Sequence, residues 1–423
     1  MLEQIISNVR VMGHHPLKDV GVADGKVVFV ENSGAAKEWT ANAVVNGEGG
    51  VLLPGLVEPH IHLEKAYLLT RMEKEAESLQ DAIRMTADMK KIFTRSDMRE
   101  RSLQVIKEAV RNGVTHMRCH AEVDPILGLS AIESALELKQ SVRHLLDLQV
   151  VAFPQEGIFK SPGTAELMEE AIHLGCDVVG GITYQDPDLN EHLKFVFELA
   201  GKYNKPLDFH ADFSDKPEDL AIVQIAKRTM QYGLQGRVSA GHVTSLGSLA
   251  RVEAEAAAEL LSEAGIHIIT LPATDLYING RGDEEKPRRG LTPVKLLQEK
   301  GVNVAIGMNN VQNPFTPFGK ADPLETAWLL AVTAYLGGER DASRLLGMLT
   351  ESASRVLALE GYGIREGAPA DMVLFRERTE RDVLLHKSET RTVWKRGVMV
   401  ADTRIERERE IVHHMKDRGE DHR

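Results

Sequence analysis

Cysteine, long apolar runs and an excess of positive charge are all scarce or missing in this chain of 423 residues. The two cysteines, Cys119 and Cys176, lie in apolar, strand-like stretches, which favours buried free thiols in a reducing compartment over a disulfide. No stretch of about 18 apolar residues occurs, so we expect no membrane-spanning helix. The first residues lack a basic segment followed by an apolar core, and we therefore expect no signal peptide and a cytoplasmic protein.

The charge balance and the length limit the possible partners and the domain organisation. Lys and Arg number 51 and Asp and Glu number 63, which gives a formal net charge of −12. An acidic surface repels the phosphates of nucleic acids and anionic membranes, so neither is an expected partner. The length exceeds that of one small domain and suits a barrel of about 250 residues with a smaller accessory domain.

Short apolar runs alternate with amphipathic helical stretches from residue 51 onward, which is typical of a parallel α/β barrel. Eight runs have the length of barrel strands: 55–62, 115–121, 149–154, 176–182, 206–211, 238–242, 266–271 and 302–307. The helical stretches are 98–112, 165–174, 191–203, 217–232, 246–264 and 340–358. Long loops at 63–78 and 272–290 follow the first and seventh strands, where loops usually shape a substrate pocket.

Both ends of the chain are β-rich instead. Strand-like pieces precede the barrel at 5–12, 20–22 and 26–30 and follow it at 370–375 and 390–396. We predict that residues 1–54 and 362–403 form one small discontinuous β-sandwich domain beside a (β/α)8 TIM-type barrel at 55–361. Residues 404–423 are dense in Arg, Glu, Lys and His, which predicts a charged C-terminal tail.

The first predicted barrel strand ends in two histidines, His60 and His62, that are separated by one residue. Alternate residues of a strand point the same way, so both side chains face the barrel mouth. The fifth and sixth predicted strands also end in histidine, at His210 and His242. Neutral imidazoles are good ligands for zinc or iron, and their placement on three strand ends favours a metal centre over histidines of the core.

Several separate segments resemble the cytosine-deaminase-like members of the amidohydrolase superfamily, of the N-isopropylammelide and cytosine aminohydrolase type. The similar segments are VEPHIHLEK at 57–65, VAFPQEG at 151–157, NGR at 279–281, RRG at 288–290 and NPFTPFG at 313–319. The likeness runs from about residue 50 to residue 360. It implies a metal-dependent hydrolase that acts on a cyclic C–N bond of a nitrogen heterocycle, with one divalent metal ion (zinc, or iron or manganese).

The resemblance also implies roles for individual side chains. His60, His62 and His210 bind the metal, and His242 contacts the bound water or the substrate. Gln155 hydrogen-bonds the heterocycle. Proteins of this type are often dimers or larger, which implies a homo-oligomer.

Two positions depart from the pattern of the family. The family has Glu three residues after the histidine of its fifth strand, where it carries a proton, and the chain has Phe213 there. The family has Asp at the end of its eighth strand, as metal ligand and proton acceptor, and the chain has Asn309. Neither side chain can act as a base, so both are expected to contact substrate instead. Because general acid–base catalysis is worth about 10²–10⁴-fold, ordinary cytosine deamination is expected to be badly impaired or absent.

Other side chains near the strand ends are candidates for the missing roles. Asp212 and Glu156, together with His242, are candidates for moving protons. Asp212 has the alternative role of capping the next helix, and Glu156 that of a structural partner. Lys65 either pairs with a loop acid or contacts the substrate, and Phe315 either walls the pocket or packs the loop.

Two main functions fit these residues. The first is a divergent hydrolase, because every histidine of the expected metal site is kept although both acids are lost. The second is a catalytically weak or inactive relative that binds a heterocyclic ligand and serves as a sensor or partner subunit. A lyase or isomerase on the same scaffold is a third possibility, and release of ammonia from a panel of heterocycles distinguishes the first from the second.

Overall fold

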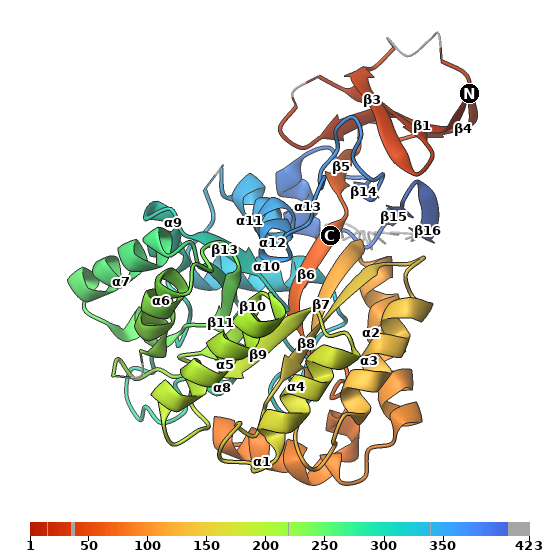
Figure 1. Ribbon diagram of the computed structural model, residues 1–423. Helices are drawn as coiled ribbons and strands as arrows, with labels where there is room; N and C mark the ends of the chain where they lie inside the picture. Colours follow the sequence, from red (N-terminus) through yellow and green to blue (C-terminus); the bar gives the residue numbers. More distant parts are fainter. Residues whose placement is uncertain (15, 35–38, 219, 339, 405–423) are drawn as a thin grey trace, which may run out of the picture.

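The computed structural model describes residues 1–14, 16–34, 39–218, 220–338 and 340–404. Its central sheet has eight parallel strands, which neighbour one another in chain order and curve into a barrel (Figure 1). The strands are β6 (Leu56–Ile61), β7 (Val114–Glu122), β8 (Asp147–Phe153), β9 (Val178–Ile182), β10 (Leu207–Ala211), β11 (Val238–His242), β12 (His267–Thr270) and β13 (Asn303–Ile306). A parallel bridge between Ile61 and Asn309 joins the first and last strands. The predicted fold class is confirmed.

Parallel strands of this kind need cover on both faces, and every residue of β9, β10 and β11 is buried. Helices surround the barrel and supply this cover (Figure 1). They are α1 (Leu79–Lys90), α2 (Arg95–Arg111), α3 (Ser130–Ser141), α4 (Thr164–Leu174), α5 (Leu189–Tyr203), α6 (Ala221–Gln231), α7 (Arg251–Glu263), α8 (Pro272–Ile278), α9 (Val294–Glu299), α10 (Pro323–Thr333), α11 (Asp341–Leu349), α12 (Glu351–Val356) and α13 (Glu380–His386).

Helix α5 shows how the sequence determines these elements. At its start, the carboxylate of Asp188 accepts hydrogen bonds from the backbone amides of Asn190 and Glu191. At its end, Asn204 adopts the left-handed conformation, with φ of 51°. Its buried side chains recur at helical spacing: His192, Leu193, Val196, Phe197, Leu199 and Ala200. This apolar face packs on β9 and β10.

The structure differs from the sequence prediction within one predicted helix and at the two long loops, and it has helices, such as α3 and α10, that the sequence analysis did not predict. The predicted helix at 246–264 is divided into a short 3₁₀ helix, η3 (Ser245–Ser248), and α7. The predicted loop at 272–290 begins with α8, because Pro272 suits the first position of a helix. Helix α1 follows the other long loop, and the hydroxyl of Ser78 accepts a hydrogen bond from the amide of Asp81 at its start.

The two chain ends form a second, separate sheet. Its strands are β1 (Leu2–Val11), β2 (Lys18–Ala23), β3 (Lys26–Asn32), β4 (Ala41–Asn46), β5 (Val51–Pro54), β14 (Met372–Phe375), β15 (Arg391–Lys395) and β16 (Val398–Thr403). They follow the order β16-β15-β14-β5-β1-β2-β3, with β4 beside β1. The antiparallel pairing of β5 with β14 joins the two ends of the chain. Buried Trp394 donates a hydrogen bond to Gln4 across this sheet at 3.0 Å.

The separate sheet contacts the barrel around Lys395 of β15. The Lys395 ammonium donates to the carboxylates of Asp147 and Asp371, at 2.8 Å each, and lies 3.5 Å from His116 Nε2. Burial and then the positive charge of Lys395 lower the pKa of His116 to about 4. These four residues, the Lys395 cluster, attach the sheet to the amino-terminal ends of β7 and β8.

Three further predictions concern single features of the chain. Cys119 and Cys176 are buried and free, as predicted. No helix within the described residues is long and apolar enough to cross a membrane. The charged tail predicted at 404–423 lies, after Arg404, outside the described residues.

Candidate active site

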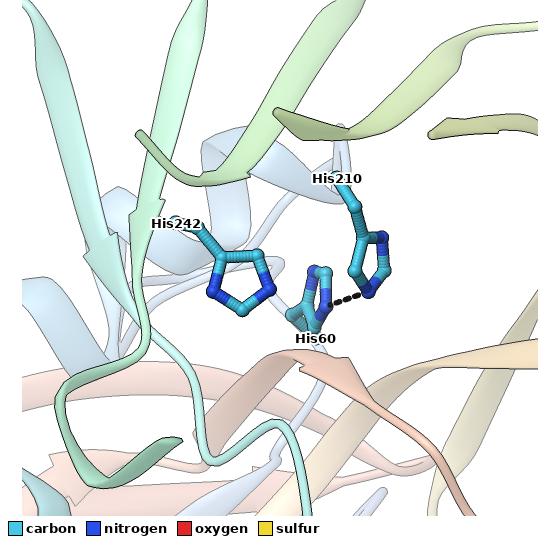
Figure 2. Close-up of side chains that lie close together, drawn as sticks. All are labelled: His60, His210 and His242. Carbon is cyan, nitrogen blue, oxygen red and sulfur yellow. Dashed lines mark hydrogen bonds between the residues drawn. The ribbon is translucent and has the colours of Figure 1, made fainter. Parts of the chain in front are cut away.

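Histidines meet at the carboxyl end of the barrel strands, as the sequence predicts. His60 lies on β6, His210 on β10 and His242 at the end of β11, and all three are buried. Figure 2 shows their rings directed toward one another, and one ligand atom of each lies within 4.8 Å of the others. His62, directly after β6, also reaches His210. We call these four residues the histidine group.

The contacts inside the histidine group are suited to a cation. His210 Nε2 lies 3.1 Å from His60 Nε2 and 3.0 Å from His62 Nε2. Since this nitrogen carries either one proton or one lone pair, it can make a normal hydrogen bond to only one of them. Burial, followed by nearby positive charges, lowers the pKa of all three imidazoles well below the usual value. A set of neutral, converging imidazole nitrogens fits a divalent metal ion such as zinc.

Asp208 lies next to the histidine group, on the same strand as His210. The sequence analysis did not identify it. Its carboxylate contacts His120 Nε2 at 3.1 Å and Arg118 at 2.8 Å, and it lies 3.8 Å from His60 Nδ1. Burial acts to raise the pKa of Asp208, but the charges of His120 and Arg118 hold it below its usual value. The signal was present in the sequence, because Asp208 precedes His210 by two residues on one strand and shares its face.

His242 is held on several sides. Its Nδ1 lies 2.6 Å from Asp275 Oδ1, and its carbonyl accepts a hydrogen bond from Thr292. The ring of Phe213 stacks on its imidazole, with centroids 3.8 Å apart and planes 10° apart. When Asp275 is ionised, it holds the proton of His242 on Nδ1, and the other nitrogen points to His60 and His210 (Figure 2). Burial raises the pKa of Asp275.

Asn309 closes the barrel seam through its backbone. Its amide donates to the His60 carbonyl, and its carbonyl accepts from the His62 amide, at 2.8 Å each. The φ of Asn309 is 63°, a left-handed conformation that Asn tolerates better than most residues. Its side-chain Oδ1 is buried with no hydrogen-bond partner among the described residues. Since an unpaired buried acceptor is costly, this oxygen is available to a ligand.

Three of the predicted substrate contacts lie together beside the histidines. The Lys65 ammonium donates to Gln155 Oε1 at 2.9 Å and to Glu122 at 2.8 Å, and it lies 4.8 Å from the ring centroid of Phe315. Although burial acts to raise it, the pKa of Glu122 is lowered to about 2 by the charges of Lys65 and Lys90. Lys65 thus pairs with an acid, as one of the two predicted alternatives has it, although Glu122 is the last residue of β7 and does not lie in a loop.

The two other candidate acids have partners of their own. Glu156 accepts a hydrogen bond from Lys90 of α1 at 2.8 Å. The carboxylate of Asp212 accepts from the backbone amides of Ala221 and Ile222, at 2.7 and 3.1 Å, at the start of α6. These contacts agree with the alternative roles that the sequence analysis considered, an ion-pair partner and a helix cap.

A separate apolar cluster covers the same end of the barrel, and we call it the apolar roof. Its buried members come from α1 and the loop before it, from α8, and from the loops after β10 and β13: Ala76, Ala82, Ile83, Phe213, Ile278 and Phe315. Figure 1 shows α1 at the end of the molecule opposite the separate sheet. The roof therefore lies over the strand ends that carry the histidines.

The comparison with known families agrees with this geometry. The profile described as amidohydrolase family matches residues 87–401. The chain belongs to the amidohydrolase family. The N-isopropylammelide isopropyl amidohydrolase of Pseudomonas sp. (strain ADP) is 26% identical to this chain, over 95% of this chain and 98% of its own length.

Two more relatives are deaminases. The pterin deaminase of Rhizobium rhizogenes (strain K84 / ATCC BAA-868) is 27% identical over 90% of this chain and 87% of its own length. The solved structure of 5-methylcytosine deaminase from Klebsiella pneumoniae, liganded with 5-fluorocytosine, has a TM-score of 0.91 and 30% identity, over 96% of this chain and 99% of that chain. The homologues of this chain thus include deaminases and aminohydrolases that act on heterocycles.

Solved structures of this fold also include metal-bound examples. An adenosine deaminase from Xanthomonas campestris with bound zinc has a TM-score of 0.67 and 17% identity, over 94% of this chain and 92% of that chain. At this identity the likeness concerns the fold alone.

Proposed function

We propose that this protein is a metal-dependent hydrolase that acts on a cyclic C–N bond of a small nitrogen heterocycle, as a divergent deaminase or aminohydrolase. His60, His62 and His210 hold one divalent ion, which is zinc, iron or manganese. The observation that carries this proposal is the approach of two imidazole nitrogens to His210 Nε2, at 3.1 and 3.0 Å, in a buried site. The amino-heterocycles named in three relatives support the substrate class.

The side chains of the site divide the work. When bound, a divalent cation supplies Lewis acidity for the attack of water on a ring carbon. His242 moves the proton, because Asp275 fixes its Nδ1 proton and leaves the other nitrogen for exchange. Gln155 and Lys65 hold the polar edge of the ring, and Asn309 Oδ1 accepts a hydrogen bond or weakly binds the metal. Phe213 carries no proton, so the role of the missing Glu falls to His242.

A second candidate function is ligand binding with little or no turnover. Phe213 and Asn309 favour it, since both acids that normally move protons in this family are replaced. The fixed ring of His242 and the buried metal-site nitrogens favour the first candidate, since binding alone needs no oriented proton carrier.

The experiment that tests the proposal begins with metal content. The purified protein is dialysed with and without zinc, iron and manganese, and elemental analysis is expected to find close to one equivalent of metal. Metal-loaded protein is then screened for release of ammonia or an amine from a panel of amino-heterocycles. Turnover supports the hydrolase, and saturable binding without release of ammonia or an amine supports the second function. Protein that holds no metal under any condition contradicts both the metal site and the hydrolase.

The double variant Phe213→Glu with Asn309→Asp tests the role of the lost acids. Because general acid–base catalysis contributes about 10²–10⁴-fold, restoring both acids is expected to raise cytosine deamination by that order. Ammonia release from cytosine by wild type and variant measures the effect. If the variant folds, binds metal and releases no more ammonia than wild type, the pocket is not arranged for cytosine-like rings.

A further inference from the structure

The loop between α8 and α9 contains the NGR and RRG segments, to which the proposed function gives no role. The side-chain amide of Asn279 donates to the carbonyl of Gly290, across the loop, at 3.1 Å and to Thr244 Oγ1 at 3.2 Å. Thr244 is fully buried and follows His242 by two residues. The first segment therefore joins the second one to the part of the chain that comes directly after β11.

Two glycines allow the two halves of this loop to approach each other. The φ of Gly290 is 57°, and a Cβ atom there would lie 2.1 Å from the Cβ of Asn279. The φ of Gly280 is 76°, and a Cβ atom there would lie 2.6 Å from the carbonyl oxygen of Arg288. Any other residue at these positions strains the backbone and meets atoms that cannot easily move. The glycines of both segments thus hold the loop in one closed shape.

Shortly after the RRG segment, Thr292 reaches a strained turn at His242. The φ values of His242 and Val243 are 71° and 52°, so two successive residues with side chains adopt the left-handed conformation. This conformation is unusual for a β-branched residue such as valine, and it persists only where the surrounding structure holds it. The buried hydroxyl of Thr292 donates to the His242 carbonyl at 2.6 Å. The loop therefore ends on the backbone of the residue to which we assign proton transfer.

We propose that Thr292 is a positioning residue, and that the loop of residues 279–292 holds the His242 imidazole in place between Asp275 and the other histidines. The carbonyl and the side chain of His242 share one Cα atom, so a bond that fixes the carbonyl also limits where the ring can point. Without the Thr292 hydroxyl, the turn is free to relax toward ordinary backbone angles, which moves the ring away from Asp275. The inference rests on the proposed function, since it takes His242 as the residue that moves the proton.

The test follows the Nδ1 proton of His242 by NMR, in zinc-treated protein labelled with ¹⁵N in histidine. A proton held between an imidazole and a carboxylate resonates at unusually low field, and loss of the signal in Asp275→Asn assigns it. Thr292→Val has a similar shape without the hydroxyl and is expected to remove or shift this resonance, whereas Thr292→Ser should retain it. If Thr292→Val does not fold, Asn279→Ala replaces it and should also shift the resonance.

Turnover gives a second measurement on the same variants. With a substrate from the amino-heterocycle screen, kcat of Thr292→Val is expected to fall by up to about 100-fold, the cost of a misplaced catalytic group, while KM changes little. Thr292→Ser should restore most of kcat. An equal kcat in Thr292→Val and wild type contradicts the inference.

The matched control is Thr229→Val. Thr229 is also buried, and its hydroxyl donates to the Ile225 carbonyl at 2.8 Å within α6, so its loss should leave the resonance of His242 unchanged. An unchanged resonance in folded Thr292→Val, or a wild-type spectrum without it, overturns this inference and leaves the metal site standing. A resonance that depends on Thr292 in protein that holds no metal supports the positioning of His242 and contradicts the proposed function.

Discussion

Each end of the barrel has a cluster of side chains of the kinds that bind metals. The two clusters differ in whether a positively charged side chain of the protein lies among them. At the amino-terminal end, ligand atoms of His116, Asp147 and Asp371 lie within 4.8 Å of one another, and the ammonium of Lys395 lies among them. At the carboxyl end, the nitrogens of the histidine group face one another. No hydrogen bond or ion pair in the described part of the chain links an ammonium or guanidinium to them.

This difference distinguishes a charge cluster with its own internal cation from the group that we propose as a metal site. When the protein folds, the Lys395 ammonium pairs with the carboxylates of its cluster and balances their negative charge. The imidazole nitrogens at the other end have no such ammonium among them, and in the proposed function their cation comes from solution. A group of possible ligands is therefore a metal-site candidate only when no side chain already occupies its centre.

The largest effect is expected from His60→Ala, which should abolish metal binding. The change removes the nitrogen that lies 3.1 Å from His210 Nε2. Elemental analysis after dialysis against zinc measures the result. His116→Ala, at the other end of the barrel, is the matched control and should keep the metal content of wild type. Full occupancy in His60→Ala, or an equal loss in both variants, would remove the distinction between the two ends.

A smaller but substantial effect is expected from Lys395→Met. Removing one partner of a buried ion pair costs about 3–5 kcal/mol in the free energy of unfolding, because the charge of Asp371 loses its ammonium. Denaturation with urea measures the loss. Lys300→Met removes a pair with Glu259 at the protein surface and should cost far less. Similar losses in the two variants would show that the Lys395 cluster does not stabilise the protein.

The smallest effect is a dependence of stability on pH that comes from His116. Folded protein keeps this imidazole neutral down to a pKa of about 4, whereas the unfolded chain takes up the proton near 6.5. The stability is therefore complete above the unfolded value and is lost as the pH falls toward 4. Between pH 7 and pH 5 the expected loss is about 2 kcal/mol. Urea unfolding of metal-free wild type and His116→Gln measures it, and an equally steep loss in the variant contradicts the assignment.

The barrel strands and the histidines were predictable because both depend on short-range patterns. A strand such as β10 is a short apolar run, and its alternation places His210 on the inner face. The same alternation points to Asp208, which shows that the pattern carried more information than the sequence analysis used. The fold class followed from eight such runs with helical stretches between most of them.

The partners of the site were not predictable in the same way. Asp275 reaches His242 from α8, and Lys90 reaches Glu156 from α1, and these helices lie within or beside the long loops of the sequence analysis. Each pair is separated by more than 30 residues in the chain, so the contact depends on how helices pack across the barrel mouth. Periodicity within one segment contains no information about such pairs.

The pairing of β5 with β14 means that β5 lacks one of its two neighbouring strands during most of the synthesis of the chain. Leu53 pairs with Val373, which follows it by 320 residues (373 minus 53). At about 5–20 residues per second, a ribosome needs roughly 16 to 64 s to add the intervening chain. Through that interval β5 has only its neighbour β1, and one edge of the sheet stays open to other chains. Chains released before β14 is made are thus expected to aggregate, whereas complete chains close that edge of β5.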